Sequence, residues 1–208
     1  MRVVKSADER KNEILDVAEQ LFSEKGFDNA STNDIINRIG IARGTLYHHF
    51  ASKEEILDAL VERMTREGIA RAGMIVMNTD VPILERLTGA IMALRIDNGA
   101  SAEVMEQIHK PQNALLHQKM QDRLLGGVVP LIAQLIKEGN ASGLFDTKFP
   151  VETAEMIMLY SSYVFDERTG LDPEEKDRKA KGFINLTEKL LGAKENSLAA
   201  AIMKLIQR

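Results

Sequence analysis

The 208-residue chain contains no cysteine, which excludes disulfide bonds and zinc sites built from thiolates. It also has no apolar stretch near the roughly 20 residues that a membrane-spanning helix needs. The opening MRVVKSADERKNE has too short an apolar stretch for a secretory signal peptide. We therefore expect a cytoplasmic protein that makes no use of a membrane.

Basic charge is scarce as well. The formal net charge is −4, and residues 1–55 hold 8 Lys or Arg against 10 Asp or Glu. This balance argues against a strongly basic nucleic-acid-binding protein. Any contact with phosphate must come from a few locally placed cations and backbone amides, with a strong dependence on salt.

Signatures of catalysis are also missing. The sequence has no phosphate-cradling glycine loop and no nucleophile-and-base motif, and only four histidines. His109 and His117 are eight residues apart, which is not the close helical spacing that a metal-binding pair prefers. We expect no enzymatic activity, no cofactor and no metal site.

Helical periodicity is what the chain does have. Apolar residues recur with a period of 3.6 from Ile14 onward, without sustained alternation, so the predicted fold class is all-α. Capping boxes are expected at Ser6 and Ser52, the second opening a long helix that runs into the 70s. Further helices are expected after Pro82 to Asn98–Gly99, at 102–109 and 112–138, from Pro150, from Asp172, and finally over Leu198, Ala201, Ile202, Leu205 and Ile206.

The sequence GGVVP at 126–130 interrupts the predicted helix 112–138. Proline removes a backbone donor, and its ring crowds the carbonyl of Gly126 four residues earlier. Two readings stay open: a bend that opens a cavity in a helical bundle, or a turn between two ordinary helices.

The segment 31–53, STNDIINRIGIARGTLYHHFASK, combines two short helical patterns around a glycine. Ser31 or Thr32 can cap the first helix. Gly40 can take the left-handed conformation that ends a helix, so a second helix is expected over 43–49. The result is a helix-turn-helix layout.

The second of these helices is expected to bury one side and expose the other. Leu46 and Phe50 are four residues apart and can share the buried side. Gly44 has no side chain, so the helix start can approach a sugar-phosphate backbone. Arg43 suits bidentate binding to guanine, and Thr45 offers a hydroxyl and a methyl group. The alternative is an ordinary helix that packs an aromatic edge into a small core.

The run T-x-x-D-I-I-x-x-x-G-I-x-x-G-T-L-Y-H-H-F-x-S-K-E-E-I-L resembles the DNA-binding domain of the TetR family of bacterial transcriptional repressors. The resemblance extends upstream through ILDVAEQLFSEKGFDNAST and covers about the first quarter of the chain. The rest is similar only in helical character and length. The resemblance implies a three-helix helix-turn-helix domain over residues 1–52 and a helical effector-binding and dimerisation domain over residues 53–208.

The same resemblance implies roles for individual residues. Tyr47 and His49 are expected to meet phosphate, while Arg43, Thr45 and His48 reach base edges. The complete set of predicted DNA-binding residues is Thr32, Asn33, Arg43, Gly44, Thr45, Tyr47, His48, His49 and Lys53.

The resemblance further implies a homodimer that binds a palindromic operator in double-stranded DNA. The helices near 151–166 and 173–191 are the candidates for its interface. A small molecule bound between the effector helices is expected to change the separation of the two recognition helices, through the long helix 53–77, and so to release DNA. Repression is the expected sign of regulation.

The identity of the effector is not readable from the sequence. Methionines of the later region suit an adaptable apolar pocket or a plain core, and its tyrosines suit either a pocket or the dimer interface. The candidate ligand-binding residues are Met64, Met92, Met105, His109, His117, Met120, Tyr160 and Tyr163. The alternative function is an orphan or architectural helix-turn-helix protein without a small-molecule ligand.

Overall fold

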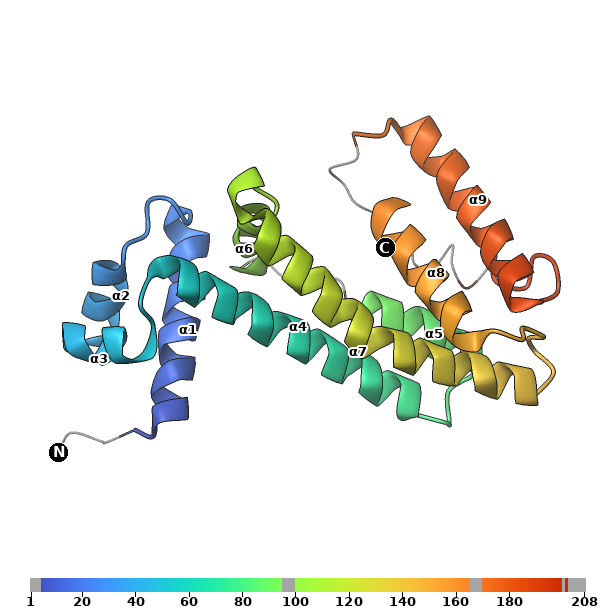
Figure 1. Cartoon of the computed structure of the whole chain (residues 1–208), viewed down its shortest axis with the longest axis horizontal. Coiled ribbons are helices and arrows are strands. Elements are labelled where there is room, and N and C mark those ends of the chain that lie inside the picture. Colours follow the sequence, from blue (N-terminus) through green and yellow to red (C-terminus); the bar gives the residue numbers. More distant parts are fainter. Residues whose placement is uncertain (1–4, 95–99, 165–169, 200, 202–208) are drawn as a thin grey trace. The chain divides into compact units, whose positions relative to one another are not determined.

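The computed structural model of the chain describes residues 5–94, 100–164, 170–199 and 201. All secondary structure in these ranges is helical, which confirms the all-α class (Figure 1). None of the helices described there is long and apolar enough to cross a bilayer. The elements are α1 (Ala7–Lys25), α2 (Thr32–Ile39), α3 (Arg43–His49), α4 (Lys53–Met77), α5 (Ile83–Met92), α6 (Ala100–Ile108), η1 (Pro111–Asn113), α7 (Ala114–Ala141), α8 (Pro150–Val164) and α9 (Pro173–Leu191).

Side-chain caps begin α1, α2, α4 and α9. Ser6 caps α1 and Ser31 caps α2, each in a complete capping box. Ser52 accepts the N–H of Glu55 at 3.2 Å, although the Glu55 carboxylate returns to the N–H of Ala51 rather than of Ser52. Asp172 caps α9 in the same way, accepting the N–H of Glu175 at 2.8 Å.

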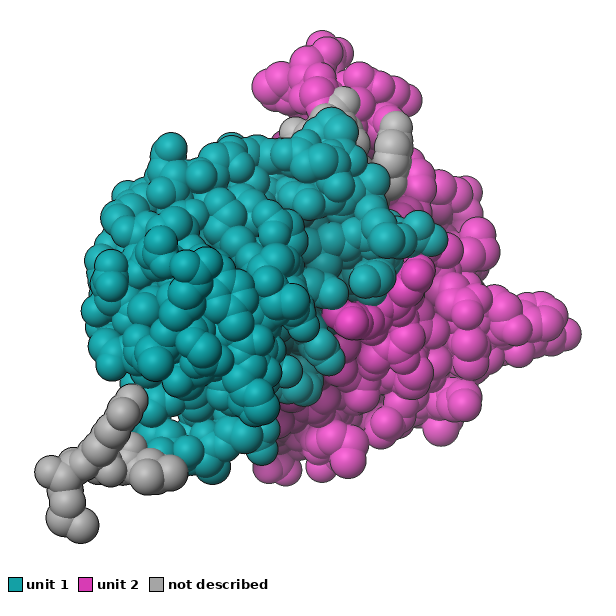
Figure 2. All heavy atoms as spheres, turned by 60° about the vertical axis from the view of Figure 1, so that its left-hand side comes forward, with its two compact units in different colours: residues 1–67, 96–121 teal, residues 68–95, 122–208 magenta. Residues whose placement is uncertain are grey.

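The chain folds into two compact units, coloured separately in Figure 2: Met1–Glu67 with Ile96–Gln121, and Gly68–Arg95 with Asp122–Arg208. Both α4 and α7 contribute residues to each unit. Packing thus groups α6 and the start of α7 with the first three helices. The functional division between residues 52 and 53 stays a prediction, because it concerns roles rather than packing.

The first unit has its core where α1, α2 and α3 meet the beginning of α4. Aliphatic and aromatic side chains from all four helices are buried there, namely Ile14, Leu15, Ala18, Leu21, Phe22, Ile35, Leu46, Phe50, Ile56, Leu57 and Leu60. The three N-terminal helices therefore fold around one apolar centre.

The second unit packs α5, the later part of α7, α8 and α9 around its own core. Arg86 lies within it, only 4% exposed. Its guanidinium donates to the carbonyl of Val76 at 2.8 Å and to the carboxylate of Glu138 at 2.6 Å. A buried charge is tolerated only when it is paired in this manner.

Helix α7 continues through Pro130, so the reading of GGVVP as a turn between two helices is wrong. Pro130 is exposed, while Val128, Val129 and Ile132 beside it are buried. Their burial favours the helical path over a break at the proline. A bend that opens a cavity stays a prediction.

The helix expected to run from Pro82 to Asn98–Gly99 ends earlier, since α5 ends at Met92 and Ala93 and Leu94 form a turn. Asn98 and Gly99 themselves, and the part of the last predicted helix beyond Ala201, lie outside the described residues. The described part shows Leu198 fully buried. The buried carboxylate of Glu188 accepts the N–H groups of Asn196 and Leu198, each at 2.9 Å, and so holds the segment after α9 against this unit.

Two glycines of α7 predict opposite effects of the same substitution. An added Cβ at Gly139 would overlap the buried ring of Phe145, whereas at Gly126 it would meet open space. We expect Gly139→Ala to lower the free energy of unfolding by about 1–3 kcal/mol, because the ring must leave its place in the core. The matched control Gly126→Ala should raise it by up to about 1 kcal/mol, because alanine favours the helix. Urea unfolding checks both, and equal effects of the two changes would contradict this packing.

Candidate nucleic-acid interface

A left-handed glycine sets the turn between α2 and α3. Gly40 has φ 74° and ψ 36°, and its N–H donates to the carbonyl of Ile36 at 2.9 Å. The N–H of Ile41 shares that carbonyl at 3.2 Å. Because residues with a Cβ rarely adopt this conformation, the chain turns here at little steric cost. This is the turn that the sequence predicted.

Burial on one side of α3 leaves its other side exposed. Leu46 is 0% and Phe50 2% exposed, as the four-residue spacing predicted. On the other side, Arg43, Tyr47 and His48 are exposed to solvent. The helix carries no acidic residue. The exposed side of α3 is therefore neutral or basic, and the buried apolar side holds the helix in place.

Tyr47 joins α3 to the start of α2. Its hydroxyl lies 3.3 Å from Oγ1 of Thr32, and the Arg43 guanidinium carbon lies 5.3 Å from the centre of its ring. The hydrogen bond with Thr32, and then the nearby Arg43 charge, lower the pKa of Tyr47. Three of the predicted DNA-binding residues thus form one contiguous polar group, which we call the Tyr47 cluster.

The other predicted residues of the turn and recognition helix lie around this cluster. Thr45 is half-buried, His48 and Asn33 are exposed, and Gly44 has no heavy atom within 4 Å of a Cβ position. The rings of His48 and His49 meet edge to face, with centroids 5.2 Å apart.

His49 lies in a locally positive environment. Its partial burial lowers its pKa, and the charges of His48, Arg10 and Lys11 lower it further. Lys11 of α1 also lies close to the end of α3, with its Nζ 5.8 Å from the centre of the Phe50 ring. The cations at the start of α1 therefore lie near the end of α3, which is where an anion would be stabilised.

Lys53 has a different environment from the one expected of a phosphate contact. Its ammonium donates to the carbonyls of Phe27, Ala30 and Asp28 at 2.7, 3.0 and 3.5 Å. It also lies 4.3 Å from the centre of the Phe27 ring. Lys53 thus holds the loop between α1 and α2, and its contact with DNA stays a prediction. Nothing local in the sequence indicates this role, because its partners are more than twenty residues away.

The candidate effector residues are divided between the two units. In the first, Met64 and Met120 are buried, Met105 is half-buried, and the rings of His109 and His117 meet edge to face at 5.2 Å. In the described residues, no three metal-ligating side chains come together. In the second unit Met92 is half-buried and Tyr160 stacks on Phe183 at 6.0 Å, while the side chain of Tyr163 lies outside the described residues.

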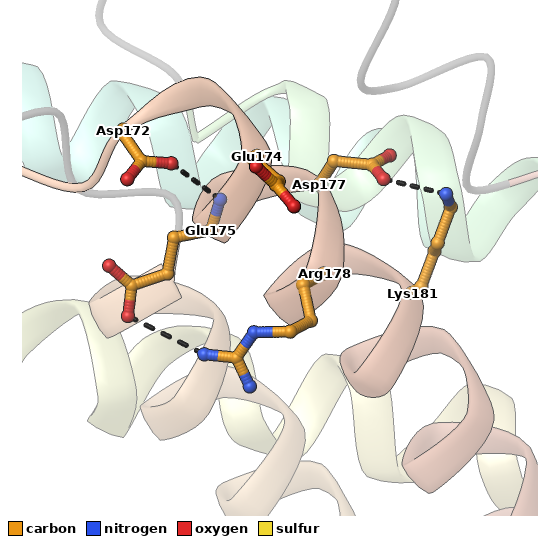
Figure 3. A pocket seen from close by; sticks show the side chains of 6 residues that line it. All are labelled: Asp172, Glu174, Glu175, Asp177, Arg178 and Lys181. Atoms are coloured by element: carbon orange, nitrogen blue, oxygen red, sulfur yellow. Dashed lines mark hydrogen bonds and ion pairs between the residues drawn. The ribbon is translucent and has the colours of Figure 1, made fainter.

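A pocket is present at the start of α9, but none of these candidates lines it. Its walls are charged side chains of the first turns, mainly Asp172, Glu174, Glu175, Asp177, Arg178 and Lys181 (Figure 3). They pair with one another, as Lys181 does with Asp177 at 2.6 Å and Arg178 with Glu175 at 3.5 Å. This open, charged surface does not suit an apolar ligand.

Family models match both the N-terminal and the C-terminal part of the chain. Residues 14–60 match the model described as bacterial regulatory proteins of the tetR family. Residues 97–181 match the tetracyclin repressor-like C-terminal domain. Together the two matches span more than half of the chain, and the first contains α2, α3 and the Tyr47 cluster.

Curated relatives match part of the chain at moderate identity. The HTH-type transcriptional repressor KstR2 of Mycobacterium tuberculosis is 42% identical over 92 residues, which cover 44% of this chain and 46% of the relative. The HTH-type transcriptional regulator UidR of Escherichia coli K12 is 43% identical over 58 residues, covering 28% of this chain and 30% of the relative. The chain thus spans less than half the length of these relatives, both of which are named as regulators rather than enzymes.

Solved structures share the fold over nearly the whole chain. A TetR-family transcriptional regulator from Pectobacterium atrosepticum has a TM-score of 0.61 at 20% identity, covering 92% of this chain and 99% of its own. GusR of Salmonella enterica has a TM-score of 0.58 at 21% identity, covering 91% and 99%. With both family models and these folds in agreement, the chain belongs to the TetR family of bacterial regulatory proteins.

Proposed function

We propose that this protein is a sequence-reading, DNA-binding repressor of transcription that acts in the cytoplasm. The observation that carries the proposal is the exposed Tyr47 cluster on α2 and α3, held by the buried Leu46 and Phe50. It lies in the segment that matches the tetR family model, and a relative that is 42% identical over 92 residues of the chain is named as a repressor. Selection of bound sequences from a random duplex library tests it.

The exposed side chains differ in chemistry, and each type suits a different contact with DNA. Arg43 and Thr45 read base edges together with His48, since a guanidinium binds guanine bidentately and a threonine methyl contacts thymine. Tyr47 and His49 contact phosphate and fix the register of α3 on the duplex. With so few cations, specific binding depends on two recognition helices acting together.

The second part of the proposal is a homodimer through α8 and α9. One side of α8 is buried in the second unit through Ala154, Ile157 and Met158. The other side leaves large apolar side chains exposed, and α9, which contacts α8, exposes one as well: Val151 41%, Met156 54%, Leu159 54%, Tyr160 39% and Leu186 52%. Clustered exposed apolar side chains are typical of protein interfaces. A two-fold axis through this face would match a palindromic operator.

The third part is regulation by a small molecule in the C-terminal domain. A ligand releases DNA only if it binds more tightly to a state with a different separation of the recognition helices. Buried and half-buried methionines on α4, α6 and α7 supply adaptable apolar surface for such a ligand.

The proposed roles of Arg43 and Tyr47 predict different changes in DNA affinity and base preference. Arg43→Ala should weaken binding to a selected duplex by about 1–3 kcal/mol and relax the preference at one base pair. Tyr47→Phe should weaken binding to all sequences about equally, because it removes the proposed phosphate contact and the bond to Thr32 but no contact with a base. Fluorescence anisotropy on matched and single-mismatch duplexes measures both.

Arg66→Ala is the control for these variants, because it removes an exposed arginine from α4, outside the predicted DNA-binding residues and outside the proposed dimer helices. It should bind like the wild type. Unchanged base preference in Arg43→Ala would show that α3 does not read DNA through this side chain.

The dimer predicts that a charge on the exposed side of α8 separates the subunits. Met156→Glu should give a folded monomer in sedimentation at micromolar concentration, because it buries a carboxylate in the interface. Met74→Glu, which changes a methionine that is 68% exposed on α4, should leave the dimer intact. A Met156→Glu protein that stays dimeric would place the interface elsewhere.

If a ligand regulates the protein, compounds that stabilise the fold should also release the protein from DNA. Compounds that raise the unfolding temperature of the protein should lower its affinity for the selected duplex by roughly 5–150-fold. The pair of measurements is thermal unfolding and anisotropy on the same compound set. Stabilising compounds that leave DNA affinity unchanged would favour the orphan or architectural alternative.

A further inference from the structure

The loop at 26–30, between α1 and α2, is contacted by elements from much later in the sequence. Within the first unit, α6 packs against α1 more extensively than α2 does. Gly26 ends α1 with φ 78° and ψ 151°, a conformation that favours glycine. The backbone therefore leaves the helix axis here, and the next N–H, that of Phe27, needs a partner outside α1.

That partner is a carboxylate of α6. Oε1 of Glu103 accepts the N–H of Phe27 at 2.9 Å, across 76 residues of sequence. The same oxygen accepts from the side-chain amide of Gln107 at 3.0 Å, and Gln107 is only 2% exposed. Since Gln107 is fixed by burial one turn further along α6, it holds the Glu103 carboxylate in place.

Two lysines contact the same loop. Lys110, just after α6, pairs with the carboxylate of Asp28 at 2.8 Å. Lys53, at the start of α4, donates to three carbonyls of the loop, as described above. The loop is thus held through a backbone N–H, a side chain and its carbonyls.

The ends of α1 and α2 do not need Glu103 in order to form. The N–H of Gly26 donates to Phe22 at 2.9 Å, and the N–H of Ala30 donates to Gly26 at 3.1 Å. Ser31 and Asp34 close the capping box of α2 by themselves. The Glu103 bond is therefore an added connection between α6 and a loop that is already closed locally.

This connection leads directly to the Tyr47 cluster. The loop ends at Ser31, the cap of α2, and the next residue is Thr32, whose hydroxyl lies 3.3 Å from that of Tyr47. A shift of the loop moves the first turn of α2 and, through Thr32, the side chain on α3. In a dimeric helix-turn-helix protein, such a shift changes the distance between the two recognition helices.

We propose that Glu103 is a positioning residue for DNA recognition, which sets the half-site spacing that the protein accepts by holding the 26–30 loop. This inference rests on the proposed function, because half-site spacing has meaning only for a dimer on an inverted repeat. It assigns to α6, outside the helix-turn-helix, a part in the choice of DNA.

The test uses the full-length protein and a duplex library in which the half-sites selected by the wild type are separated by spacers of different lengths. The wild type should recover one spacing. Glu103→Ala should bind neighbouring spacings too, so that its preference for the best spacing over the next best falls by about threefold to thirtyfold. Glu103→Gln keeps an acceptor oxygen for the Phe27 N–H and should retain most of the preference.

The matched control is Glu106→Ala, which removes the same charge from an exposed position on α6. It should keep the spacing preference of the wild type. Hydrogen exchange of the Phe27 amide, measured alongside, should quicken in Glu103→Ala and stay unchanged in Glu106→Ala. If Glu103→Ala does not fold, Lys110→Ala takes its place, because it breaks the contact of α6 with Asp28, and the same widening is expected.

Each outcome decides between the two proposals. A wild type that recovers an inverted repeat, with Glu103→Ala equally selective for spacing, overturns the inference and leaves the proposed function standing. A loss of thermal stability without a change in spacing preference also overturns it, because the role of Glu103 would then be structural alone. A wild type that recovers no inverted repeat overturns the proposed function and this inference together.

Discussion

The short helix α3 depends on the burial of one side. It has seven residues, and Ala42 provides no side-chain cap for its first turn. A helix of this length is not stable alone in water. Burial of Leu46 and Phe50 in the core of the first unit contributes about 1.5–3 kcal/mol for each side chain and fixes the helix in place. The presentation of Arg43 and Tyr47 to solvent follows from that apolar contact.

An acidic chain can present a locally basic helix because carboxylates of the neighbouring helices are paired with cations of those helices. Lys25 pairs with Asp34 at 2.8 Å, and Arg38 binds Glu24 through two hydrogen bonds of 2.8 and 3.0 Å. These exposed pairs add little stability. They neutralise carboxylates on the first two helices, however, and α3 itself has no acidic residue. The net charge of −4 is thus compatible with local positive charge at α3, from Arg43 of the helix and from Lys11 of α1.

Sequence predicted the features whose physical causes are local. The cap at Ser31, the left-handed turn at Gly40 and the spacing of Leu46 and Phe50 each depend on residues within four positions, and the structure has all three. The family resemblance was also correct. The continuous α7 was not resolved from sequence, because the fate of Pro130 depends on burial of neighbouring side chains rather than on proline itself.

Long-range contacts were beyond the reach of the sequence. Lys53 donates to carbonyls of the 26–30 loop, and Glu103 accepts the N–H of Phe27 from 76 residues away. Neither pairing leaves a periodic or local signal. The same is true of the grouping of α6 with the N-terminal helices, which depends on tertiary packing alone.

Hydroxyl-radical footprinting on a duplex selected by the protein tests the central claim most directly, since it locates the two α3 helices on the DNA. We expect two protected segments on one face of the duplex, with centres roughly one helical turn of 34 Å, or a multiple of it, apart. A single protected segment, or uniform protection along the duplex, would contradict a symmetric dimer that reads DNA through α3.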